Sequence, residues 1–138
     1  MNKCLEIYKN FIDGLVKKKN GKVRVVRYEK RHEQLVESGI NNISMALYNE
    51  SEEEKASILL CLDKYLDPYY GYNLPYKADI IVLLQKILFE DNSTEIKEDI
   101  LELLQFNGGQ PLTILEQNID KLSGELYKYA RYILCDKE

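Results

Sequence analysis

The chain has 138 residues, of which 45% are hydrophobic and 30% are charged, and its net charge at pH 7 is -4. This composition is typical of a soluble globular protein and argues against extensive disorder, and the length predicts a single domain over residues 1–138. No apolar run exceeds five residues and the N-terminus lacks the pattern of a secretion signal, so neither a membrane span nor export is expected, and we predict a cytoplasmic protein.

Cysteine and histidine usage predicts no catalytic or metal site. Cys4, Cys61 and Cys135 are widely spaced in apolar helical contexts, which indicates reduced core thiols. The single histidine, His32, is expected at the boundary of an amphipathic helix and not as a base. Because the chain contains no nucleophile elbow, phosphate-binding loop or metal-ligand spacing, we expect neither an enzyme nor a cofactor.

Charge is distributed unevenly along the chain. Residues 1–31 carry a net charge of +7, and residues 32–138 carry a net charge of -11. The basic excess is concentrated in one segment of fifteen residues, which could bind nucleic acid or fold back on the acidic body. A single aromatic residue in that segment, Tyr28, is too little for a base-stacking platform. The basic residues are Lys17, Lys18, Lys19, Lys22, Arg24, Arg27, Lys30 and Arg31.

The N-terminal half predicts four helices. Apolar spacings of three and four residues indicate helices over residues 2–18, 28–38 and 42–49, with an Asn-Gly turn and a short extended piece around residues 23–26 after the first of them. Ser51 begins a capping-box pattern with Glu54, which predicts the start of a fourth, largely apolar helix that ends near Leu66.

The C-terminal half predicts a helical hairpin followed by a longer helical region. Residues 77–90 and 94–105 form the hairpin, with Asn92 and Glu95 as a second capping-box candidate. Apolar residues then recur without interruption over residues 111–136. One continuous helix is the simplest interpretation, and two helices divided at Ser123-Gly124 are the alternative.

Two segments are candidate partner-binding sites. Five of the eleven tyrosines lie within residues 65–76, where prolines and a glycine predict a loop between helices. Tyrosines in a loop suit protein recognition, although rings such as Tyr65 and Tyr76 at the helix margins are expected to cap the core. The expected contact residues are Asp67, Tyr69, Tyr70 and Tyr72, together with an acidic stripe of Glu95, Glu98, Asp99 and Glu102 that could equally be a solvated helix face.

These elements predict an all-α fold, a compact bundle of antiparallel helical hairpins with about six to eight helices. Residues 78–106 resemble one HEAT-type unit, because a buried helix, a tight turn containing Asp91 and a second amphipathic helix follow one another. No second unit repeats this pattern, so a long solenoid is not expected.

A small acidic helical chain with the sequence DPYYGY in a loop also resembles the immunity proteins of bacterial polymorphic toxin and contact-dependent growth inhibition systems, several of which are HEAT-like. In the immunity proteins of nuclease colicins, an adjacent tyrosine pair near acidic residues forms the binding hot spot. The resemblance therefore implies a hot-spot role for Tyr69 and Tyr70, with Asp67 as a charged neighbour. It implies a cognate toxin domain, such as a nuclease, as the protein partner.

Two functions are therefore expected from the sequence. The first is an immunity protein that neutralises a toxin through tyrosine and acidic surface residues. The alternative is a nucleic-acid-binding or generic helical adaptor protein that uses residues 17–31.

Overall fold

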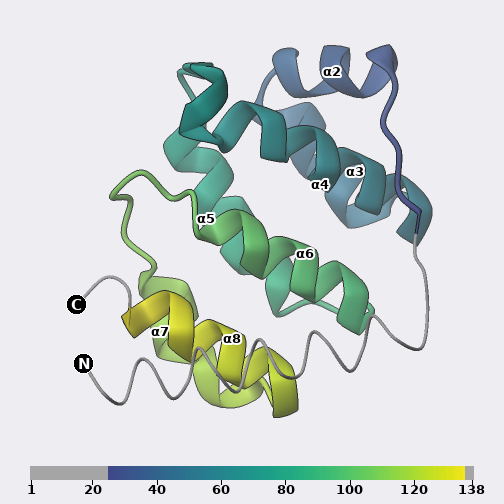
Figure 1. Cartoon of the computed structure of the whole chain (residues 1–138). Coiled ribbons are helices and arrows are strands. Elements are labelled where there is room, and N and C mark those ends of the chain that lie inside the picture. The colour runs from purple at the N-terminus through teal and green to yellow at the C-terminus, as the bar shows by residue number, and fades with distance from the viewer. Residues whose placement is uncertain (1–24, 136–138) are drawn as a thin grey trace. The chain divides into compact units, whose positions relative to one another are not determined.

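The computed structural model describes residues 25–135, which form seven α-helices and two short 3-10 helices and contain no β-strand (Figure 1). The all-α prediction is therefore confirmed. The predicted helix over residues 2–18 lies outside the described residues, and Val25 and Val26 precede the first described helix without forming a strand. The elements are α2 (Lys30–Glu37), α3 (Ile40–Asn49), α4 (Glu52–Leu66), η1 (Pro68–Tyr70), α5 (Lys77–Leu88), α6 (Thr94–Leu104), α7 (Thr113–Asn118), η2 (Ile119–Lys121) and α8 (Gly124–Cys135).

The contacts divide the chain into two units. The larger one, residues 26–112, contains α2 to α6 and both candidate partner-binding segments. The described part of the other unit is Val25 and residues 113–135, with α7, η2 and α8. The prediction of a single domain stays a prediction.

Helix α4 is the central element of the larger unit. It packs against α2, α3 and α6, and α6 also packs against α5 (Figure 1). The sequence predicts this position, because apolar residues cover most of the helix circumference. Ile58, Leu59, Cys61 and Leu62 of α4 are all buried.

The start of α4 follows only half of the predicted capping box. The Ser51 hydroxyl accepts a hydrogen bond from the Glu54 amide at 3.2 Å, which satisfies one of the first-turn donors. The Glu54 carboxylate does not complete the box. Both of its oxygens instead contact Arg31 and His32 of α2, because a charged guanidinium and a buried imidazole are stronger partners than one backbone amide.

The turn between α5 and α6 uses different residues from those predicted. Ser93, and not Asn92, caps α6 by accepting a hydrogen bond from the Ile96 amide at 3.2 Å. The Asn92 side chain instead donates to the Ile87 carbonyl at 3.0 Å and accepts from Lys55 of α4 at 2.9 Å. Asn92 therefore closes the C-terminus of α5 and ties the turn to α4.

The C-terminal region contains two helices, so the alternative of two helices divided at Ser123-Gly124 is confirmed, and one continuous helix over residues 111–136 is wrong. After α7 the chain tightens into η2, Leu122 is extended, and Gly124 begins α8 with a positive φ of 58°. Such a φ interrupts a helix and favours glycine. Buried residues recur on both sides of the break, which explains the unbroken apolar spacing. They are Leu115, Leu122, Tyr129 and Ile133.

None of the described helices is long and apolar enough to cross a membrane.

Candidate partner-binding site

The tyrosine-rich segment begins with a short turn that Asp67 organises. Helix α4 ends at Leu66, and an Asp67 carboxylate oxygen accepts a hydrogen bond from the Tyr69 amide at 3.0 Å. Pro68 occupies the first position of η1, where its missing amide proton costs nothing. Gly71, with a φ of 72°, ends the turn in the left-handed region. The backbone beneath the tyrosine pair is therefore held by local interactions.

Three tyrosines of this segment expose much of their surface. The exposed fraction is 87% for Tyr69, 54% for Tyr70 and 47% for Tyr72. The rings of Tyr69 and Tyr70 meet edge to face, with centroids 5.2 Å apart. Large aromatic side chains are rarely left this accessible in a group unless they make contacts with another molecule. We call Tyr69, Tyr70 and Tyr72 the exposed tyrosines.

The other two tyrosines of the segment are anchors, as the sequence predicts. Tyr65 is only 3% exposed, and its hydroxyl donates to a Glu37 carboxylate oxygen at 2.7 Å. The half-buried Tyr76 donates its hydroxyl to the Val36 carbonyl. Both acceptors lie at the end of α2. Burial raises the pKa of Tyr65 and of Tyr76, and the nearby Glu37 charge raises both further. Both phenols therefore stay protonated, and each can keep donating.

Tyr72 is partly anchored as well. Its ring lies against that of Tyr65, with centroids 4.7 Å apart and planes inclined by 46°. The Lys64 ammonium lies 5.3 Å from the Tyr72 centroid and 5.6 Å from the Tyr65 centroid, and it forms an ion pair with Glu33 at 2.6 Å. Hydrogen bonds to Glu33 and then to Tyr72 raise the pKa of Lys64, so the ammonium stays charged. One face of Tyr72 is thus held by the protein, and the remainder is open.

Asp67 has a structural role in addition to its expected one as a charged neighbour of the pair. One of its carboxylate oxygens is committed to the Tyr69 amide, and the residue is half-buried. Its charge acts on Asp63, one turn earlier in α4, whose pKa is raised by burial and then by Asp67. Asp67 is therefore a cap of the turn and also a source of negative potential beside the exposed tyrosines.

The acidic stripe of α6 is not a uniformly solvated face. Glu95, Glu98 and Asp99 are half-buried, whereas Glu102 is exposed, and all four take part in interactions within the chain. The structure brings only Asp99 and Glu102 to the surface of α4, where they line a groove with Asp63. Asp63 lies one helical turn before Asp67, at the end of α4 that leads into the tyrosine loop.

Most of the predicted basic segment, Lys17 to Arg24, lies outside the described residues. Among the described members, Arg27 and Lys30 are exposed, and Arg31 makes a bidentate contact with Glu54 at 2.6 and 2.8 Å. This contact raises the pKa of Arg31 and leaves its guanidinium bound within the protein. Arg31 is therefore a structural cation that links α2 to α4.

The sequence interpretation of His32 as a boundary residue is wrong. His32 is 2% exposed, its Nδ1 accepts a hydrogen bond from the Glu29 amide at 2.8 Å, and its Nε2 lies 3.1 and 3.2 Å from the two Glu54 oxygens. Hydrogen bonds from Arg31, and then from His32, lower the pKa of Glu54 to about 2. The spacing of Glu29 and His32, three residues apart at a helix start, is the signal that could have located this contact.

The described residues contain no group of three or more His, Cys, Asp or Glu side chains that could hold a metal ion. Cys61 is buried, and burial raises the pKa of its thiol to about 12, so it is an inert core thiol as predicted. Cys135 is half-buried, and Cys4 lies outside the described range.

No protein-family model, curated protein or solved structure matches this chain.

Proposed function

We propose that this chain is an immunity protein, which binds a cognate bacterial toxin domain and blocks it through the exposed tyrosines. The observation that carries the proposal is the presentation of Tyr69, Tyr70 and Tyr72 on a turn whose two ends are tied to α2. A binding surface that is already ordered loses little conformational entropy when a partner docks. Tyrosine suits the centre of such an interface, since it offers a large apolar ring and one hydroxyl.

Charge supports a basic partner. Residues 26–112 contain sixteen Asp and Glu against eight Lys and Arg, a net charge of -8. Toxin domains that cleave nucleic acid carry positive surfaces for phosphate, and opposite charge accelerates association by steering the partner toward the interface. In this proposal the acidic stripe and Asp67 supply the steering potential, and the exposed tyrosines supply the contacts that exclude water.

The experiment pairs this chain with the toxin domain of a secreted protein encoded beside its gene. Binding is measured by calorimetry at two salt concentrations, and protection is measured as growth when both proteins are produced in one cell. We expect tight binding with an association rate that falls as the salt concentration rises. We also expect cells that produce both proteins to grow. Absence of binding and of rescue would leave a generic helical adaptor as the better description.

A matched pair of substitutions tests the site itself. Tyr69→Ala and Tyr70→Ala should each weaken binding by about 30-fold or more, equivalent to ~2 kcal/mol. Tyr48→Ala is the control, because Tyr48 lies on α3 and is 44% exposed, close to the value for Tyr72. If the control weakens binding as much as the pair does, or if the pair has no effect, the tyrosine loop is not the interface.

Nucleic-acid binding through residues 17–31 stays a prediction. The described residues give it no added support, because Arg31 is engaged by Glu54. Filter binding at low and moderate salt separates the two functions: tight, salt-sensitive binding of nucleic acid would favour this alternative.

A further inference from the structure

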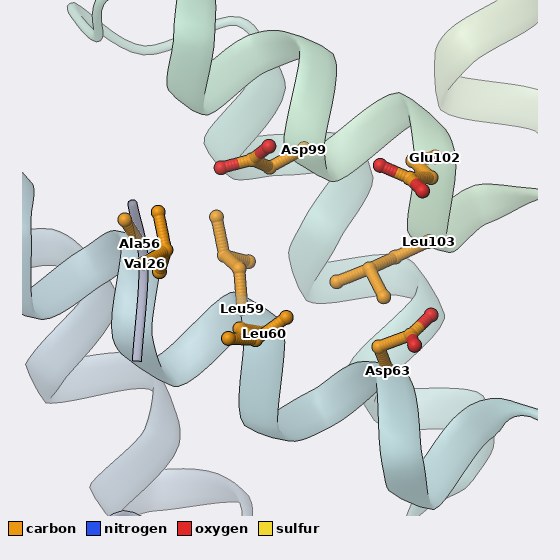
Figure 2. Close-up of a pocket in the computed structure, with 8 residues that line it drawn as sticks. All are labelled: Val26, Ala56, Leu59, Leu60, Asp63, Asp99, Glu102 and Leu103. Carbon is orange, nitrogen blue, oxygen red and sulfur yellow. The ribbon is translucent and has the colours of Figure 1, made fainter. Parts of the chain in front are cut away.

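A groove between α4 and α6 combines an apolar floor with acidic walls. Its volume is about 150 Å³. Leu59, Leu60 and Asp63 of α4 lie on one side, and Asp99, Glu102 and Leu103 of α6 lie across from them (Figure 2). Among the described residues that line it, none is basic. A group that enters this groove meets leucine side chains and up to three carboxylates.

Leu60 makes the floor accessible. It is 39% exposed, although its neighbours Leu59 and Leu103 are buried. Asp63 stands one turn further along α4, half-buried at the same groove. Since burial and the Asp67 charge raise the pKa of Asp63, its ionised form is poorly compensated there, and a cation beside it would be stabilised. Asp99 and Glu102 already interact within the chain, so the contact with a cation is assigned to Asp63.

The shape and charge of the groove select one kind of occupant. A cavity of about 150 Å³ accommodates a group as large as benzene, which is the size of one long side chain and far smaller than a helix. Anionic side chains are repelled by the walls, and a purely aliphatic chain would desolvate the carboxylates without pairing them. Arginine and lysine combine an apolar stem with a cationic head, and they commonly lay the stem on apolar surface while the head stays with polar groups.

We propose that the α4–α6 groove receives one arginine or lysine side chain of the protein partner, with the stem on Leu60 and Leu103 and the head at Asp63. This inference rests on the proposed function, because the groove lies along α4 toward the end that leads into the exposed tyrosines. Asp63 and the turn residue Asp67 are one helical turn apart, close enough for their charges to interact. The tyrosines would then form the apolar centre of the interface, and the groove would form a specific basic-residue pocket beside it.

The test does not need the toxin. The full-length chain, labelled with carbon-13 at leucine methyl groups, is titrated with N-acetyl-arginine amide, N-acetyl-norleucine amide and N-acetyl-glutamate amide. We expect the arginine probe to shift the methyl signals of Leu60 and Leu103 in a saturable manner, the norleucine probe to shift them weakly, and the glutamate probe to leave them unchanged.

Two substitutions with matched controls locate the contact. Asp63→Asn should weaken binding of the arginine probe by about tenfold, as expected for loss of one charge-assisted contact. Glu53→Gln removes the same charge from the exposed first turn of α4 and should have little effect. Leu60→Gln should weaken binding of the arginine probe. Val82→Gln changes a residue of similar exposure on α5 and should leave this binding unchanged.

Two results would overturn the inference. One is the absence of any shift at Leu60 and Leu103 with the arginine probe, and the other is equal binding by the Asp63→Asn protein. Either result leaves the proposed function intact if Tyr69→Ala still weakens toxin binding by about 30-fold or more. Conversely, arginine binding in the groove without any effect of the tyrosines on toxin binding would reject the tyrosine interface and retain the pocket.

Discussion

The α5–α6 turn and the tyrosine loop are both anchored to the rest of the larger unit by side chains. Only the tyrosine loop also exposes a group of large aromatic rings. The α5–α6 turn is tied down by Asn92, which contacts the Ile87 carbonyl and Lys55. The tyrosine loop is tied to α2 through Tyr65 and Tyr76. Anchoring is thus a structural requirement that both connections meet. The three large exposed rings of the tyrosine loop go beyond that requirement, and this difference favours it as the functional connection.

The largest expected difference is between an anchoring tyrosine and an exposed tyrosine of the same loop. Tyr65→Ala should lower the free energy of unfolding by about 3 to 5 kcal/mol, because it removes a buried ring and leaves a cavity. Tyr69→Ala should change it by less than about 0.5 kcal/mol, because the ring is almost fully exposed. Urea denaturation of both proteins measures the difference. Equal losses would mean that Tyr69 also holds the fold.

Asn92→Ala tests the anchor of the other connection. We expect the free energy of unfolding to fall by about 2 kcal/mol, because the Ile87 carbonyl and the Lys55 ammonium both lose a partner in a half-buried setting. Thermal unfolding checks the loss, and binding of the proposed toxin partner should be unaffected. A weakened interface in this variant would show that the α5–α6 turn also contributes to recognition.

Two substitutions at Asp67 distinguish its role as a cap from the effect of its negative charge. Asp67→Ala should cost about 1 kcal/mol of stability through loss of the cap, whereas Asp67→Asn keeps a side-chain acceptor and should cost a few tenths. Amide exchange at Tyr69, measured by NMR, should accelerate in the alanine protein alone. If both proteins bind the toxin equally weakly, the Asp67 charge matters more for recognition than the cap does.

The smallest effect concerns pH. The folded-state pKa of Glu54 is depressed to about 2 from an ordinary value of 4.5, so its contribution is fully present above pH 4.5 and is lost as the pH falls from there toward 2. We expect this contribution to the free energy of unfolding to be about 1 kcal/mol or less, because Arg31 is solvent-exposed and water screens its charge. Glu54→Gln should remove this component of the acid dependence. An unchanged pH profile would show that the contact between α2 and α4 does not depend on Glu54 ionisation.

Local patterns predict much of this structure. Apolar spacing located the helices from α2 to α6 to within a few residues, because a helix buried on one side must repeat its apolar residues every three or four positions. Ser51 as the cap of α4 is a local interaction that the sequence shows directly. The division of the tyrosines into anchors and exposed rings was also predictable, because Tyr65 and Tyr76 adjoin helices and the others do not.

Contacts between distant residues could not be predicted in this way. The partners of Glu54 lie more than twenty residues earlier in the chain, so the capping-box pattern suggested a local use for a carboxylate that Arg31 and His32 occupy. Asn92 was similarly assigned to the wrong helix end, because Lys55 and the α5 terminus compete for it. Apolar spacing over residues 111–136 favoured one helix, because both helices bury the same series of residues, and only the Ser123-Gly124 pair indicated the break at Gly124.

The sequence alone determines the helical class, the approximate helix starts and the position of a tyrosine-rich loop, because these depend on spacing and on interactions within a few residues. Tertiary structure decides which carboxylates are caps, ion-pair partners or groove walls, because that choice depends on which helices pack side by side. The juxtaposition of Asp63, Asp99 and Leu103 across α4 and α6 exists only after packing, whereas the tyrosine-rich composition of the loop is visible in the sequence itself.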